Sequence, residues 1–153
     1  MEIRCAGIED TARILELFRE LDSCSARQQP EHFRIGERSA EYLRDLICGD
    51  DSDFLLCVDN DDIIGFSLIF LKGTKPLSLL IPCRYAYIQD FVITENRRGQ
   101  GYGTVLLNAS REWAKERGAG YLRLSVIPTN DAGIRFYRKN GLDEQMITME
   151  CPI

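Results

Sequence analysis

Three glycines alternate in the segment RRGQGYG, residues 97–103, between an apolar strand-like run at 85–93 and a helix-like run that follows. Glycine suits positions where the backbone takes a positive φ or approaches a ligand closely. Free N–H groups at the start of a helix, with the positive end of its dipole, bind anions. Arg97 and Arg98 add positive charge beside them. The pattern indicates a site for a phosphate-bearing ligand, against the alternative of a glycine-rich connection that binds nothing.

Two common phosphate motifs fit this segment poorly. The dinucleotide fingerprint has the spacing G-x-G-x-x-G early in a chain, whereas the spacing here is G-x-G-x-G and lies late. A P-loop requires a lysine before its Ser/Thr, and here Thr104 follows Gly103 directly. Neither a dinucleotide nor a nucleoside triphosphate site is therefore favoured.

The segment R-G-Q-G-Y-G matches Q/R-x-x-G-x-G/A, the pyrophosphate loop of the GCN5-related N-acetyltransferases (GNAT), and the chain resembles that family. A second segment, residues 130–142, resembles the family's N-x-x-A-I-x-F-Y-x-x-x-G-F, with Gly133 in place of alanine and Leu142 in place of phenylalanine. The two motifs stand in the family's order. The first half of the chain, which shapes acceptor specificity in such enzymes, offers no comparable match.

The resemblance implies acetyl-CoA as co-substrate, with no metal, and direct transfer of the acetyl group to an amine in a ternary complex. Backbone N–H groups from Gly99 to Thr104 are expected to hold the pyrophosphate, and the edge of residues 91–93 to pair with the pantetheine amides. Asn130 could contact the pantetheine or cap the following helix. The expected binding residues are Phe91, Val92, Ile93, Arg98, Gly99, Gln100, Gly101, Tyr102, Gly103, Thr104, Asn130 and Tyr137.

Acetyl transfer needs a base for the amine, donors for the oxyanion and an acid for the thiolate. Tyr137, at the family's F-Y position, is the candidate acid, and the N–H of Val92 or Ile93 the candidate oxyanion donor. Relatives carry a glutamate base on the strand that this chain lacks, and Asp90 remains as a carboxylate in an otherwise apolar strand. Such residues are often functional. Pairing with an arginine, or a water chain as the base, remain alternatives.

Strand alternation predicts that odd-numbered residues from Tyr85 to Ile93 share one face and that Asp90 lies on the other. Apolar periodicity predicts an order β-α-α-β-β-β-α-β-α-β, a three-layer α/β fold whose central strands splay around the cofactor arm, as the family resemblance implies. The expected strands are 3–6, 54–58, 63–71, 85–93, 121–126 and 146–151; the expected helices are 8–21, 39–48, 102–117 and 131–139, with a polar loop at 22–37.

Composition narrows the class of protein. A chain of 153 residues with 44% hydrophobic and 28% charged residues predicts one globular domain, residues 1–153. A net charge of −5 argues against nucleic acid as partner. Six cysteines without a C-x-x-C pair, and one histidine, favour neither zinc nor a disulfide framework, and most of these cysteines are expected to be buried. The charged N-terminal region predicts no signal peptide or membrane span, hence a cytoplasmic protein.

The sequence thus predicts an acetyl-CoA-dependent N-acetyltransferase whose acceptor is a primary amine of a small molecule. A peptide or protein amine is the main alternative, and a non-catalytic acyl-CoA sensor is the other, because the strand lacks the usual glutamate. A homodimer formed through the last strand is a further expectation.

Overall fold

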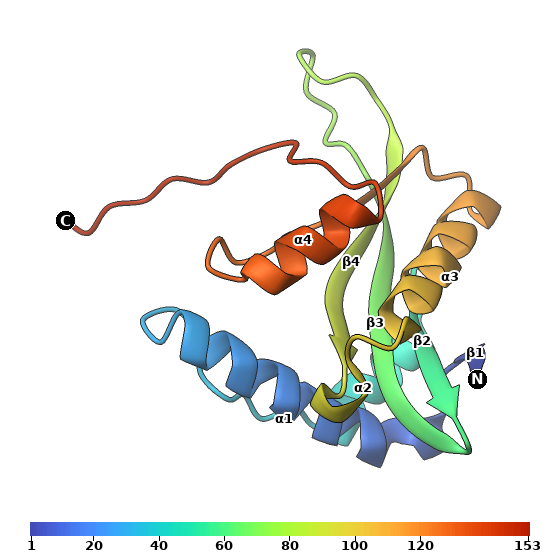
Figure 1. Ribbon diagram of the computed structural model, residues 1–153. Helices are drawn as coiled ribbons and strands as arrows, with labels where there is room; N and C mark the ends of the chain where they lie inside the picture. Colours follow the sequence, from blue (N-terminus) through green and yellow to red (C-terminus); the bar gives the residue numbers. More distant parts are fainter.

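The computed structural model describes residues 1–153. One mixed sheet of five strands, in spatial order β1-β2-β3-β4-β5, carries helices on both faces, which confirms the predicted α/β class (Figure 1). The elements are β1 (Glu2–Cys5), the short 3-10 turn η1 (Ile8–Asp10), α1 (Thr11–Gln28), α2 (Ala40–Ile47), β2 (Ser52–Asp59), β3 (Asp62–Gly73), β4 (Arg84–Ile93), η2 (Glu95–Arg97), α3 (Tyr102–Glu116), β5 (Tyr121–Leu124) and α4 (Asp131–Lys139). None of the helices combines the length and the apolar character that crossing a membrane requires.

The first four strands are antiparallel neighbours, and β5 pairs parallel to β4. The β2–β3 hairpin turns at Asn60 and Asp61, which have φ of 51° and 65°. Asn and Asp tolerate this left-handed conformation better than other non-glycine residues. The predicted hairpin is confirmed.

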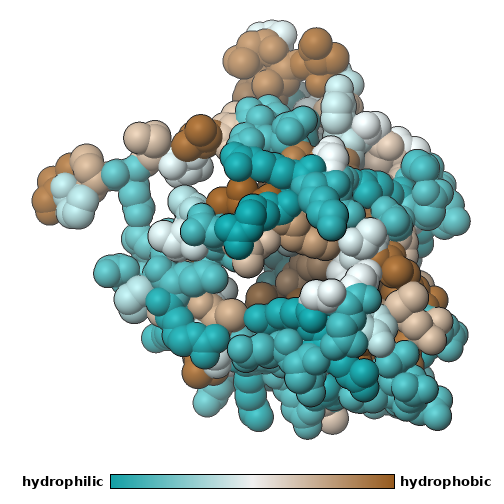
Figure 2. All heavy atoms as spheres, viewed as in Figure 1, coloured by the Kyte–Doolittle hydropathy of each residue, from teal (hydrophilic) through white to brown (hydrophobic).

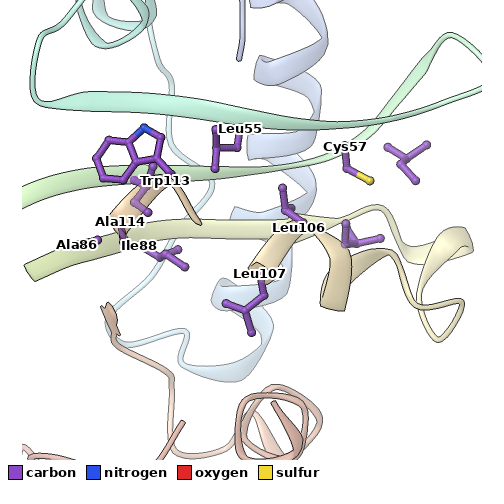
Figure 3. Packing of buried hydrophobic residues seen from close by; sticks show 11 residues of the cluster. Leu55, Cys57, Ala86, Ile88, Leu106, Leu107, Trp113 and Ala114 are labelled. Atoms are coloured by element: carbon purple, nitrogen blue, oxygen red, sulfur yellow. The ribbon is translucent and has the colours of Figure 1, made fainter. Parts of the chain in front are cut away.

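Two apolar clusters hold the helices against the sheet. On one face, α1 and α2 contribute Ile14, Leu17, Phe18 and Leu43, which pack on Phe54, Phe66 and Leu68 of the sheet. On the other face, Leu106, Leu107 and Trp113 of α3 pack on β2 and β4 (Figure 3). We call these faces the α1/α2 face and the α3 face. Side chains of α4 also pack against the α3 cluster, so that α4 covers part of the α3 face.

A bulge at Gln89 overturns the predicted division of β4 into two faces. Leu68 of β3 pairs with Asp90, but the next residue, Ile69, pairs with Ile88, so Gln89 has no pairing partner on β3. Beyond one extra residue in a strand, the even-numbered and odd-numbered side chains exchange faces. Ala86 and Ile88 therefore pack on the α3 face together with the odd-numbered Phe91 and Ile93, while Asp90 and Val92 lie on the α1/α2 face.

Three other expectations need correction. Residues 22–28 continue α1 and are not a loop; Leu21 packs against the α1/α2 cluster, and residues 22–26 stay half-buried. Residues 146–151 form no strand; the chain after α4 extends away from the sheet (Figure 1). Among the six cysteines, all free, only Cys57 is buried. The apolar runs around the cysteines predicted burial, but most of these runs lie at the ends of elements, which are at the surface.

Candidate active site

The glycine segment forms an open turn at the N-terminus of α3. Gly99 and Gly101 have φ of 76° and 92°, and a Cβ at either position would meet nothing within 4 Å. Backbone conformation, not lack of space, therefore selects glycine at these two positions. Gly103 differs, since its Cβ would lie 3.3 Å from the Phe136 ring. Its lack of a side chain lets α4 approach α3 closely.

The turn presents a row of unused backbone donors. The N–H groups of residues 99–103 donate to no protein acceptor, whereas the N–H of Thr104 donates to the carbonyl of Gly101 at 3.0 Å. Five consecutive free N–H groups at the positive end of a helix dipole make a strong anion site. They fit the pyrophosphate of acetyl-CoA, and of the six predicted N–H donors only that of Thr104 is already occupied.

The side chains of the same segment point elsewhere. Arg98 donates from Nε to the carbonyl of Ile93 at 2.8 Å and from Nη2 to Glu20 at 3.3 Å, while Arg97 pairs with Asp59 at 3.5 Å. The Tyr102 hydroxyl also donates to Asp59, at 2.9 Å. These bonds fasten the turn to α1 and to the β2–β3 hairpin. Arg98 therefore acts in this structure by holding the turn in place.

The end of β4 next to the turn has an open edge. Pairing between β4 and β5 stops at Ile88 and Leu124, while β4 continues to Ile93. Backbone groups alternate between the two edges of a strand. Because Thr94 donates to Ile64 of β3 at 2.8 Å, Val92 also faces β3, and the N–H groups of Phe91 and Ile93 face the open edge. The predicted splay is therefore visible as this divergence of the two strands.

Figure 2 shows a hollow between α1 and α4, with apolar residues at its bottom. In Figure 1 the open end of β4 lies in this same region, between the two helices. An extended ligand arm that paired with Phe91 and Ile93 would therefore lie in a groove and not on a flat surface.

Tyr137 of α4 lies on the α3 face beside that edge. Its ring packs edge-on against Phe91, with ring centroids 6.2 Å apart, and against Phe136 at 5.2 Å. Burial raises the pKa of the Tyr137 hydroxyl to about 12. The hydroxyl makes no hydrogen bond within the protein, so it remains a protonated donor without an internal partner.

Asp90 lies on the α1/α2 face, opposite Tyr137 across β4. Burial raises the pKa of its carboxyl, the positive charge of Arg38 opposes that change, and Asp22 acts in the same direction as burial. Asp90 forms no ion pair; Arg38 pairs with Asp22 instead, at 2.6 Å. A partly desolvated carboxylate without an ion-pair partner can accept a proton.

Sequence reasoning missed the two residues that fasten the loop before α2 to α1. Asp22 accepts from the Arg38 guanidinium at 2.6 and 3.0 Å and from the Gly36 N–H at 2.9 Å, which fastens residues 29–39 onto α1. Arg38 also lies over the Phe18 ring, 4.0 Å from its centroid. No motif marks this set; only the helical phase of Asp22, one position after apolar Leu21, could have suggested it.

Asn130 is a helix cap. Its side chain accepts from the N–H of Gly133 at 3.0 Å at the start of α4. A Cβ on Gly133 would lie within 3.0 Å of the Asn130 side chain, so glycine there permits a tight cap. The cap orients the first turn of the helix that carries Tyr137.

Known proteins are similar to this chain in sequence and in fold. A family model described as Acetyltransferase (GNAT) family matches residues 14–142. The Uncharacterized N-acetyltransferase YhfO of Bacillus subtilis (strain 168) is 28% identical over 148 residues, 94% of this chain and 91% of that protein. The streptothricin acetyltransferase of Streptomyces lavendulae is 30% identical over 96 residues, 61% of this chain. The chain spans about half the length of the first curated relatives that it matches, 46% and 47%.

Among solved structures, the tetramutant of the BH1408 protein from Bacillus halodurans superposes with a TM-score of 0.94 at 27% identity and covers 100% of both chains. The structural likeness therefore extends over the whole chain. From the match over residues 14–142 and the agreement in fold, the chain belongs to the GNAT acetyltransferase family.

Proposed function

We propose that this protein moves the acetyl group of acetyl-CoA to a primary amine of a small molecule, by direct transfer in a ternary complex. The observation that carries the proposal is the row of five free N–H groups at residues 99–103, next to the open edge of β4. The turn suits a pyrophosphate, and the edge suits an amide-bearing arm. Acetyl-CoA, the family's co-substrate, offers both, with its thioester at the end of the arm.

The two faces of β4 divide the chemistry. The amine approaches from the α1/α2 face and gives a proton to Asp90 as its nitrogen attacks the thioester carbon. The N–H of Ile93, with that of Phe91, points from the open edge towards the oxyanion that develops. The C–S bond then breaks, and Tyr137 gives its hydroxyl proton to the departing thiolate on the α3 face. An N-acetyl product and free CoA leave the site, and both side chains return to their starting protonation through solvent.

The likeness to streptothricin acetyltransferase supports a small-molecule acceptor, since that relative is named for its substrate. The site itself supports a partly enclosed acceptor region, because residues 29–39 are fastened over α1. We therefore favour a compact amine over an extended peptide.

A panel of amines with acetyl-CoA, read by the release of free thiol, tests the proposal. We expect at least one small primary amine to accelerate thiol release over the amine-free rate, and no free peptide amine to do better. Acceleration by peptides alone would reassign the acceptor class. Tight CoA binding with no turnover on any amine would leave the acyl-CoA sensor as the better explanation.

Initial rates with both substrates varied then separate direct transfer from an acetyl-enzyme route. Intersecting double-reciprocal lines are expected for a ternary complex. Parallel lines, with an acetylated protein visible by mass spectrometry, would overturn that part of the proposal.

A further inference from the structure

One half-buried arginine of this chain differs from the others in its contacts. Those that bond to an oxygen atom of the protein are Arg4, Arg13, Arg38, Arg97, Arg111 and Arg117. Arg123 of β5 is also half-buried, yet no carboxylate lies within 4.0 Å of it and none of its N–H groups donates a hydrogen bond. Its guanidinium lies over the rings of Tyr85, at 4.4 Å, and Tyr121, at 5.4 Å. A partly desolvated cation with free donors favours an anionic ligand.

Lys72 of β3 repeats this arrangement on the other side of β4. Its Nζ lies 4.4 Å from the centroid of the Tyr87 ring and 5.5 Å from that of Phe70. It too has no carboxylate within 4.0 Å and donates no hydrogen bond. Contact with the face of an aromatic ring holds a cation in place and leaves its N–H groups available. Two cations with free donors therefore flank β4.

Both cations lie on the face of the sheet that carries Asp90. The two neighbours of Arg123 in β5 pack on the α3 face, so Arg123 points to the α1/α2 face. Lys72 lies over Phe70, which packs against the α1/α2 cluster. The α1/α2 face thus carries a carboxylate on β4 and a cation on each of the two neighbouring strands.

The bulge at Gln89 brings Asp90 onto this face. The tyrosines beneath the cations, Tyr85 and Tyr87, lie on the α1/α2 face because the residues between and after them pack on the α3 face. In a regular strand Asp90 would lie on the opposite face from both. On β3, the pairing partners of Asp90 and Tyr87 are two residues apart, so the two side chains stand about 7 Å apart along the strand. A small molecule can span that distance.

This part of the α1/α2 face is accessible. Lys72 is exposed, and the aromatic rings beneath the two cations are at most half-covered. In Figure 1, α1 and α2 lie beside the end of β4 that leads to η2, and the start of β4 lies beyond them. A molecule bound at Asp90 can therefore extend along β4 towards the cations.

We propose, on the basis of the acetyl transfer described above, that the acceptor is a primary amine that also carries a carboxylate, and that Arg123 and Lys72 select it. The amine lies at Asp90, and the carboxylate lies towards Tyr85 and Tyr87. There the fork of the guanidinium presents parallel N–H donors to both carboxylate oxygens, and Lys72 adds a point charge. The same two cations repel an acceptor that carries a second ammonium group in place of the carboxylate.

Pairs of amines that differ only in the carboxylate test the substrate class. The series from glycine to ε-aminocaproate is compared with the alkylamines that have a methyl group in place of the carboxylate, with acetyl-CoA and thiol release as readout. At least one acid should exceed its alkylamine about tenfold or more in kcat/KM. If the alkylamines match or exceed the acids in every pair, the carboxylate site is overturned and the acetyl transfer stands.

Calorimetry with CoA bound to the protein gives the same comparison without turnover. Selective binding of the acids with no acetylation would support the carboxylate site and overturn the proposed transfer. Absence of both binding and acetylation for every acid and every alkylamine would overturn both proposals.

Arg123→Met removes the charge and keeps an apolar stem over the rings. We expect kcat/KM for the preferred acid to fall about tenfold through KM, with that of the matching alkylamine unchanged. Arg123→Lys should recover part of this loss. Lys72→Met should act in the same direction with a smaller effect, and, because Lys72 is exposed, it tests the same prediction without cost to folding.

Arg84→Met is the matched control. It removes the same charge from the residue before Tyr85, where the side chain is exposed, forms no ion pair and points to the α3 face. The preference for the acid should not change in this variant. Equal losses in Arg84→Met and Arg123→Met, or an equal fall for acid and alkylamine in Arg123→Met, would refute selection by Arg123.

Discussion

In the mechanism that we propose, the two sides of β4 recognise their substrates with different parts of the chain. On the co-substrate side, the donors are backbone N–H groups of residues 99–103 and of Phe91 and Ile93. On the acceptor side, the charged groups are side chains that come from three separate segments: Asp22 of α1, Arg38 of the 29–39 loop and Asp90 of β4. The first set depends on backbone conformation, and the second on how distant segments pack.

This difference determines how each site responds to amino-acid substitution. A backbone site tolerates most substitutions except those that alter φ or fill the open space. A side-chain site can be rebuilt one residue at a time without loss of the fold, because loops carry specificity on a fixed scaffold. The acceptor side is therefore where enzymes with this scaffold can diverge.

Gly101→Glu should have the largest effect. It forces a non-glycine residue to φ of 92° and puts bulk and negative charge where the pyrophosphate would lie. We expect CoA affinity to fall by more than about 100-fold in calorimetry. Gly118→Glu, at φ of 70° beyond the other end of α3, carries the same backbone strain away from the site and should bind normally. Equal losses in both variants would show that the turn does not bind the phosphates.

Tyr137→Phe should come next, and should act on turnover alone. Loss of the acid is expected to lower kcat about 100-fold while CoA affinity stays within about twofold. Because the pKa of Tyr137 is raised to about 12, the wild-type hydroxyl stays protonated below that pH. Its titration should therefore cause no fall in activity on the alkaline side of the pH–rate profile below that pH. Tyr121→Phe, which removes an exposed hydroxyl at the sheet edge, should leave kcat unchanged. An unchanged kcat in Tyr137→Phe would remove this residue from the mechanism.

Asp90→Asn should have a smaller effect on rate and a distinct effect on pH dependence. The carboxylate is the working form, so activity falls as pH drops through its pKa, and burial moves that limb above the range of an ordinary aspartate. The variant should lose about tenfold in kcat near neutral pH and lose the acid limb. A limb that persists in the variant would assign the base to another group.

Stability should change in the opposite direction for the same variant. A carboxyl whose folded-state pKa is raised favours folding only when protonated, below its unfolded pKa, and that contribution disappears as pH rises through the folded pKa. Asp90→Asn should therefore raise the free energy of unfolding at neutral pH by up to about 1 kcal/mol. Thermal unfolding at two pH values gives this comparison.

Arg38→Met should have the smallest effect on activity. It also separates the acceptor side of β4 from the co-substrate side most clearly. Its guanidinium lowers the pKa of Asp90 and fastens residues 29–39 to Asp22. Removing it should move the acid limb to higher pH and raise the acceptor KM a few-fold, with CoA affinity unchanged. Arg4→Met breaks a similar two-bond pair with Asp10, at 2.7 and 2.8 Å, at the start of the chain. That control should change neither value, and an equal change in both variants would indicate a general loss of stability.

The local structure of the glycine turn and of α4 could be predicted because its signals are local. A positive φ at Gly99 and Gly101 needs glycine, the helix follows at once, and the F-Y pair and Asn130 cap lie within one short segment. The same locality explains the correct hairpin at Asn60. The contacts of the Arg98 side chain could not be predicted in this way. Its partners, Glu20 and the Ile93 carbonyl, depend on the docking of α1.

Residue order alone therefore determined the family, the glycine turn, the helix with Tyr137 and most of the sheet, since each depends on neighbours a few positions apart. Only packing in three dimensions decided the bulge at Gln89, and with it the face on which Asp90 lies. Packing also joined Asp22 to Arg38 and left residues 143–153 off the sheet. A strand can be recognised from its own residues, but its register and its partner depend on the surface available to it.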